Sequence, residues 1–120
     1  MVYNYEIVII DKEDTMSQFI ANTLLENGIV ALSIKNKDRA KAPLFLNQKP
    51  AKIIIYDGDI YDDTLEFSKI LRDNCKKSFL IFALEQDMDE MEEMIARTYP
   101  VNMFVKKPYS IYEIVSLLKK

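Results

Sequence analysis

The sequence contains no histidine, no tryptophan and a single cysteine, Cys75. A lone cysteine excludes an internal disulfide and fits a reducing compartment. Without histidine, the chain lacks the usual ligands of zinc sites and the base of histidine-dependent nucleophiles. A bound metal ion would need oxygen ligands, which favours magnesium or calcium.

The sequence also lacks a basic excess and long hydrophobic runs. Lysine and arginine total 16 against 19 acidic residues, so the net charge is −3, whereas nucleic-acid binders usually carry a basic excess. The longest apolar runs have about six residues, far fewer than the roughly 20 that cross a bilayer. Residues 1–6 lack the features of a signal peptide. We therefore expect one cytoplasmic domain, residues 1–120, with no direct contact to nucleic acid or membrane.

Strand and helix patterns alternate along the whole chain. Apolar runs typical of strands buried on both faces occupy residues 7–10, 53–56 and 79–84, and further strand patterns occupy 29–34 and 103–105. Apolar residues at helical spacing follow four of these strands, at about 15–27, 65–74, 88–99 and 111–118, and the segment 38–48 is the least clear of the expected helices. This alternation predicts right-handed crossovers and a three-layer α/β domain, with one parallel sheet covered by helices on both faces.

Several helix ends carry residues typical of caps. Asp14 or Thr15 is expected to cap the first helix at its start, and Gly28 at its end. Pro43 suits a first helical turn, so the second helix should be short and start late. Ser110, with Glu113 three residues later, predicts a capping box for the last helix.

Charged side chains follow four of the expected strands. Because the carboxyl ends of parallel strands share one edge, where open α/β sheets bind their ligands, we expect these side chains to meet. A carboxylate there could hold a cation or attack phosphorus to form an aspartyl phosphate, and a lysine could hold the phosphoryl oxygens. One aspartate alone would fit a helix cap equally well, but four strand ends favour a site. The residues are Asp11, Asp57, Asp59, Glu85 and Lys107.

These residues and the order of the elements make nearly the whole chain resemble the receiver domain of response regulators, the CheY-like family. Residues 8–11 are similar to the family's first strand and metal-binding acid, and residues 54–57 to the strand that leads to the phosphoacceptor. Residues 105–109 resemble the lysine-proline-aromatic signature after the last strand. The resemblance implies a sheet order of 2-1-3-4-5, a magnesium ion, and a phosphoryl group received from a histidine kinase or phosphotransfer protein.

The resemblance also implies roles for single residues. Asp57 would be the phosphoacceptor and Lys107 the phosphate contact. The metal ligands would be the carboxylates of Asp11 and Asp57 and the backbone carbonyl of Asp59. The other positions are the switch positions Ala83 and Phe104, and Lys12, Asp59 and Glu85, which would modulate the site.

Four positions depart from the family pattern. Lys12 replaces a second acid, Ala83 a threonine or serine, Tyr61 a proline, and residues 99–100 a Gly-Ala pair. An ammonium about 4 Å from a carboxylate contributes about 4 kcal/mol of attraction at an intermediate dielectric. We therefore expect Lys12 to pair with Asp57 and weaken magnesium binding. Ala83 removes a hydroxyl that would bond the phosphoryl group, so we expect a weaker conformational switch.

Three functions remain open. The first is a receiver domain phosphorylated on Asp57, which is no enzyme beyond self-catalysed phosphorylation and dephosphorylation. The second is a pseudo-receiver, in which Lys12 neutralises Asp57 and the domain acts as a protein-interaction module. The third is a flavodoxin-like cofactor-binding protein, which is poorly supported because the loop after Ile10 lacks a Gly/Ser/Thr-rich phosphate cradle.

The last two helices and the strand between them form the usual partner surface of receivers. An output protein or a second copy of the chain could bind there, and exposed aromatic residues would indicate such an interface. The aromatic residues along it are Phe104, Tyr109 and Tyr112. Methionines more often fill a core, so we expect most of Met88, Met91 and Met94 to be buried.

Overall fold

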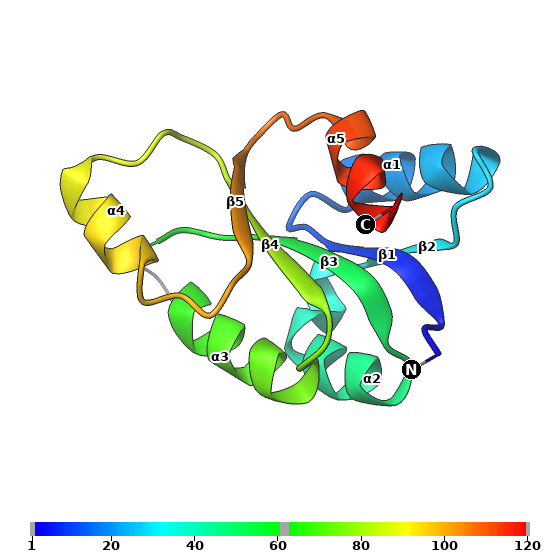
Figure 1. The fold of residues 1–120 in the computed structure, drawn as a ribbon, viewed down its shortest axis with the longest axis horizontal. Helices are drawn as coiled ribbons and strands as arrows, with labels where there is room; N and C mark the ends of the chain where they lie inside the picture. The colour runs from blue at the N-terminus through cyan, green and yellow to red at the C-terminus, as the bar shows by residue number, and fades with distance from the viewer. Residues whose placement is uncertain (1, 61–62, 120) are drawn as a thin grey trace.

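The computed structural model describes residues 2–60 and 63–119 (Figure 1). In this part of the chain five parallel strands form one sheet of order β2-β1-β3-β4-β5. The strands are β1 (Tyr5–Ile10), β2 (Ala31–Ile34), β3 (Ala51–Asp57), β4 (Phe79–Leu84) and β5 (Met103–Lys106). The predicted three-layer α/β fold and the sheet order implied by the resemblance are confirmed. Tyr61 lies outside the described residues.

Helices cover both faces of the sheet, with α1 and α5 on one face and α2 and α3 on the other (Figure 1). The α-helices are α1 (Asp14–Glu26), α2 (Ala42–Gln48), α3 (Thr64–Asn74), α4 (Glu90–Ala96) and α5 (Ile111–Ser116). Two 3₁₀ helices, η1 (Asn36–Lys41) and η2 (Leu117–Lys119), precede α2 and follow α5. No helix in the described part of the chain is long and apolar enough to span a bilayer.

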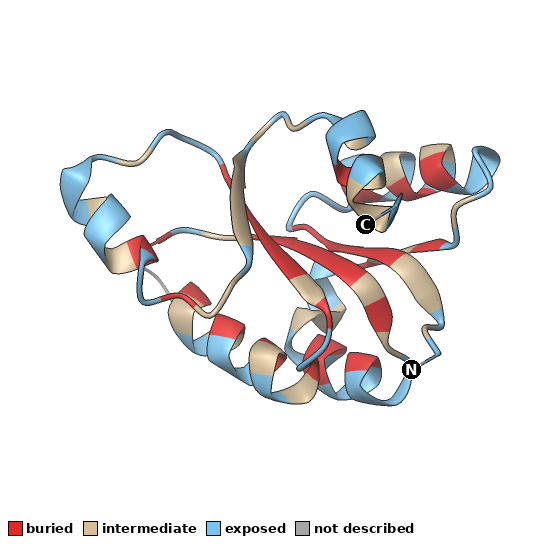
Figure 2. Cartoon of the chain, viewed as in Figure 1, coloured by how far each residue is buried: buried red, intermediate tan, exposed pale blue. Residues whose placement is uncertain are grey.

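The central strands are buried on both faces because alternate residues enter two different cores (Figure 2). Ile54 of β3 packs in the core beneath α2 and α3, whereas its neighbours Ile53 and Ile55 pack in the core beneath α1 and α5. β3 pairs in register with both β1 and β4, so the carboxyl ends of these three strands lie level with one another.

The start of α1 differs from the expectation. The cap position is Glu13, with no side-chain cap, and Asp14 is the first helical residue. The carboxylate of Asp14 instead accepts the backbone N–H of Asn36 at 2.8 Å, so it holds the start of η1. The end of α1 is as expected, because Gly28 has the positive φ of 80° that suits glycine.

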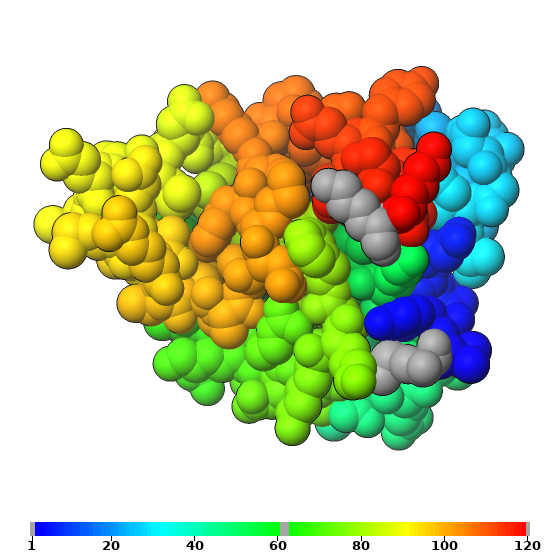
Figure 3. All heavy atoms as spheres, in the orientation of Figure 1, coloured from blue at the N-terminus to red at the C-terminus, as the bar shows by residue number. Residues whose placement is uncertain are grey.

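The methionines of the α4 region are more exposed than expected. Met91 and Met94 are each 66% exposed, so the prediction that most of them are buried is wrong. The helix α4 is short, because the capping box of Asp89 and Glu92 starts it at Glu90 and it ends at Ala96. Ala96 is the residue that it buries, so Met91 and Met94 stay exposed. Figure 3 shows α4 projecting at one end of the molecule.

Candidate functional site

Asp57 is the last residue of β3 and lies at the carboxyl edge of the sheet. The side chain is only 1% exposed, because β1 and β4 flank β3 on both sides. Its register partner on β4 is Ala83, which is also buried. A buried carboxylate at a sheet edge needs hydrogen-bond or charge partners.

Lys107 is one of those partners. Its Nζ lies 3.1 Å from Asp57 Oδ2, 2.7 Å from Asp11 Oδ2 and 3.6 Å from Glu85 Oε1. Burial by itself would lower the pKa of Lys107, but the hydrogen bonds to Asp11 and Asp57 outweigh it and raise that pKa. The structure thus brings these four residues together, as expected from their positions after the strands.

Arg39 binds the other oxygen of Asp57, and the sequence reasoning missed it. Its Nη1 lies 2.8 Å from Asp57 Oδ1, and its Nη2 donates to the backbone carbonyl of the same residue. The guanidinium also lies over the ring of Phe67, 4.8 Å from the ring centroid. The side chain of Arg39 is 21% exposed and lies between Asp57 and the solvent.

Arg39 reaches Asp57 because η1 is fixed over the carboxyl edge. The Asp14 carboxylate holds the N–H of Asn36 at one end of η1, and α2 begins at the other end with Ala42 in the core. Nothing in strand or helix periodicity marks this arginine. The one available signal is that it is one of only three arginines in the chain and follows the second strand.

These contacts set the charge of Asp57. Burial raises the pKa of this carboxyl, but hydrogen bonds and positive charge from Lys107 and Arg39 more than compensate, so its pKa lies below the ordinary value. The backbone N–H of Lys12 also donates to Oδ1, at 3.2 Å. Asp57 is therefore ionised at neutral pH, with both oxygens paired.

The side chain of Lys12 does not pair with Asp57. Its Nζ lies 3.3 Å from Glu85 Oε1, in an ion pair whose two side chains are about half exposed. The expected Lys12–Asp57 ion pair is wrong, because Arg39 and Lys107 already hold the carboxylate and the ammonium of Lys12 finds Glu85 at the rim.

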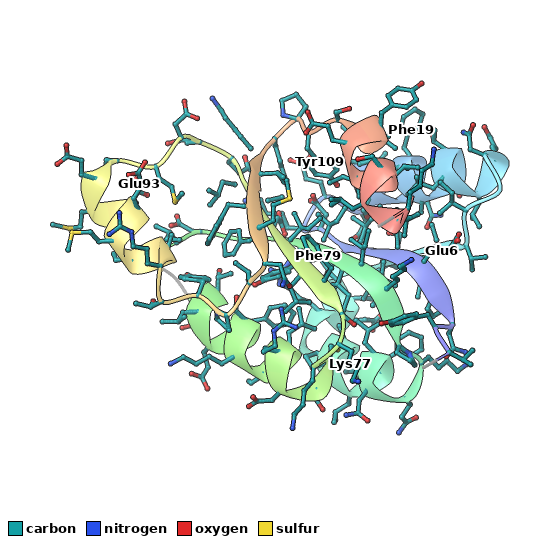
Figure 4. The ribbon with its side chains drawn as sticks, viewed as in Figure 1. Glu6, Phe19, Lys77, Phe79, Glu93 and Tyr109 are labelled. Carbon is teal, nitrogen blue, oxygen red and sulfur yellow. The ribbon has the colours of Figure 1, made fainter. Side chains whose placement is uncertain are left out.

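Of the two expected switch positions, Ala83 is buried and Phe104 is partly buried against the core. Ala83 packs in the core beneath α1 and α5, and Phe104 packs on the ring of Phe82, with centroids 5.5 Å apart. Close by, Tyr109 lies between β5 and α5 (Figure 4). Its hydroxyl is buried with no hydrogen-bond partner among the described residues. Burial, and then the negative charge of Asp11, raise the pKa of Tyr109 to about 12.

The residues of this edge fit a divalent cation poorly. The ammonium of Lys107 lies between Asp11 and Asp57, and Arg39 holds both Oδ1 and the backbone carbonyl of Asp57. The described residues include no group of three or more histidine, cysteine, aspartate or glutamate side chains that could hold a metal ion. Asp59 borders the cavity beside Arg39, and its backbone carbonyl as a metal ligand stays a prediction.

No family model matches this chain, and no curated protein does. Solved structures do. One is a response regulator from Burkholderia pseudomallei with a phosphorylated aspartic acid, a calcium ion and citrate, at 14% identity and a TM-score of 0.73. The match covers 95% of this chain but 66% of that one, just under two thirds.

Two further matches are receiver-sized. The receiver domain of Francisella response regulator 1452 has 22% identity and a TM-score of 0.70, with 96% of this chain and 93% of that chain covered. Chemotaxis protein CheY4 of Vibrio cholerae has 15% identity and a TM-score of 0.73, with 96% of each chain covered. The chain therefore has the CheY-like fold of response-regulator receiver domains.

Proposed function

We propose that this chain is a receiver domain of two-component signalling that accepts a phosphoryl group on Asp57. One observation carries the proposal: a single ammonium, Lys107 Nζ, contacts the carboxylates of both Asp57 and Asp11 at the carboxyl edge of the sheet. A buried, ionised carboxylate beside a lysine is suited to attack phosphorus and to keep the product charge balanced.

The phosphoryl donor would be a histidine kinase or phosphotransfer protein. In the transfer, the P–N bond of a phosphohistidine breaks and a P–O bond to Asp57 forms. The leaving imidazole nitrogen keeps the electron pair of the P–N bond and takes up a proton from the solvent. Lys107 faces the new negative charge, and the chain itself supplies no further chemistry beyond self-catalysed phosphorylation and dephosphorylation. The phosphorylated aspartic acid in the Burkholderia response regulator supports this assignment by analogy.

The pseudo-receiver is the second candidate, and Arg39 favours it. Because Arg39 and Lys107 already pair both oxygens of Asp57, the carboxylate could be a permanent structural anion. Ala83 offers no hydroxyl for a phosphoryl group. In either case the output would pass through protein contacts, and the exposed side chains of Met91, Met94 and Tyr112 on α4 and α5 suit such contacts.

Intact-mass spectrometry separates the two candidates. The protein is incubated with acetyl phosphate, with and without Mg²⁺, beside Asp57→Asn as the control. We expect the mass of one added phosphoryl group in the wild type and none in Asp57→Asn. If the wild type gains no phosphoryl group under either condition, and Arg39→Ala gains none either, the domain acts as a pseudo-receiver.

A further inference from the structure

We propose that the guanidinium of Arg39 is the resident cation of this site and replaces a divalent metal ion, so that Asp57 can be phosphorylated without one. The inference rests on the proposed function and names the cation that serves it. It starts from the poor fit between the residues of this edge and a divalent ion.

The guanidinium of Arg39 lies where a metal ion bound to Asp57 would have to lie. Arg39 binds two oxygens of the same residue, the Oδ1 and the backbone carbonyl of Asp57. A metal ion bound by Asp57 Oδ1 would have to displace this guanidinium, which is also stacked on Phe67 and fixed by the docking of η1. The Oδ2 side offers no alternative, because the ammonium of Lys107 already bridges Asp57 and Asp11.

The charge of the site also disfavours a divalent ion. Ion pairs join six side chains into one cluster, whose three acids balance its three bases, so its net charge is zero. A divalent ion would add two positive charges to this neutral cluster, and displacing Lys107 would leave Asp11 without its ion pair. The members are Asp11, Asp57 and Glu85, with Lys12, Arg39 and Lys107.

Arg39 and Lys107 also suit the charge and shape of an acyl phosphate. Converting the Asp57 carboxylate into an acyl phosphate adds one negative charge and three acceptor oxygens. A guanidinium is always protonated and presents a planar fork that binds phosphate with two hydrogen bonds, and Lys107 adds a point charge. Beside Arg39 lies an open cavity of about 720 Å³, bordered also by Lys12 and Phe67, which gives a phosphoryl donor room to approach.

The transfer needs no further reactant. With acetyl phosphate as donor, the bond between phosphorus and the acetyl oxygen breaks, and acetate leaves with the electron pair. A new P–O bond joins phosphorus to the Asp57 carboxylate. No proton moves and no oxidant or reductant is consumed, so the only requirement is positive charge around the phosphoryl oxygens, which Arg39 and Lys107 provide.

The first test measures metal binding, independently of phosphorylation. Mn²⁺ is titrated, by electron paramagnetic resonance, into the wild type, Arg39→Ala, Arg39→Gln and Arg97→Ala, an exposed arginine used as the matched control. We expect the wild type and the control to bind Mn²⁺ at least about tenfold more weakly than the Arg39 variants, because each variant frees Asp57 Oδ1. Circular dichroism checks that each variant is folded. If Arg39→Ala does not fold, Arg39→Gln, which keeps a polar side chain over Phe67, takes its place. Equal Mn²⁺ affinity in all folded proteins would overturn the inference.

The second test measures the rate of phosphoryl addition from acetyl phosphate, with EDTA or with Mg²⁺. We expect the wild-type rate to change less than about twofold between them, and the Arg39→Ala rate in EDTA to fall at least about tenfold and recover with Mg²⁺. A wild type that needs Mg²⁺ overturns the inference and leaves the proposed function standing. No adduct in any protein overturns the proposed function, and the Mn²⁺ titration then still decides whether Arg39 occupies the cation position.

Discussion

Replacing Arg39 by methionine removes the guanidinium from Asp57 and leaves an unbranched apolar stem over Phe67. The substitution deletes the charge-assisted hydrogen bond to Asp57 Oδ1, the bond to its backbone carbonyl and the contact of the cation with the ring. Among the described residues, Oδ1 then keeps the backbone N–H of Lys12, at 3.2 Å. We expect this loss to appear as a large decrease in the free energy of unfolding.

The magnitude follows from the burial of Asp57. Removing one partner of a buried ion pair costs about 3–5 kcal/mol, and the remaining contact of Lys107 with Oδ2 reduces that to about 2–4 kcal/mol. At about 2 cal/mol/K of unfolding entropy per residue, a chain of this length loses about 4 °C of Tm per kcal/mol, so Tm should fall by about 8–16 °C. Arg97→Met, at an exposed position, should change stability by less than about 0.5 kcal/mol.

The pH dependence gives the sign of the effect. Because the pKa of Asp57 in the folded protein lies below the ordinary value of 3.8, its pairing stabilises the fold above that pH. The stabilisation is lost as the pH falls through the folded pKa. The stability difference between wild type and Arg39→Met should therefore be full at pH 7 and shrink below about pH 4.

Urea unfolding of wild type, Arg39→Met, Asp57→Asn and the double variant measures the coupling directly. If the guanidinium acts through Asp57, Arg39→Met should cost less than about 1 kcal/mol in the Asp57→Asn background. An Arg39→Met variant as stable as Arg97→Met at pH 7 would show that Arg39 is an ordinary solvated charge and does not stabilise Asp57.

Three other substitutions or reactions test separate parts of the structure. A Cβ on Gly58 would overlap the Thr64 side chain, so Gly58→Ala should cost about 1–3 kcal/mol in urea unfolding, and adding Thr64→Ala should recover most of it; no recovery would contradict the overlap. Lys12→Asp breaks the half-exposed ion pair with Glu85, so it should change the free energy of unfolding by less than about 1 kcal/mol. By itself it should add no Mn²⁺ binding. A new Mn²⁺ site in this variant would show that Lys12, and not Arg39, is the cation that excludes the metal ion. Burial raises the pKa of Cys75 to about 11, so a thiol reagent at pH 8 should label the native protein much more slowly than the urea-unfolded one, and equal rates would contradict its burial.

The fold could be predicted because a doubly covered parallel sheet demands uninterrupted apolar strands, and three of them stand out in the sequence. The short α2 could also be predicted, since Pro43 fits the first helical turn. The helix α4 could be predicted only in part. Its methionines recur at helical spacing, yet Met91 and Met94 face solvent, because spacing shows that residues share a side of a helix but not what covers that side.

The site residues also differ in how well they could be predicted: those placed by strands could be, and those placed by the connections between strands could not. Asp57 and Lys107 could be predicted to meet because Asp57 ends β3 and Lys107 follows β5, and the parallel strands of one sheet end at the same edge. Arg39 lies on η1, and its reach depends on the path from β2 to α2 and on the extension of a long side chain, neither of which leaves a periodic signal. Lys12 directly follows Asp11 in the sequence, but that position does not decide which carboxylate its flexible ammonium meets. A metal site inferred from acids at strand ends therefore depends equally on the cations that the connections bring to that edge, and here one connection brings a guanidinium to Asp57.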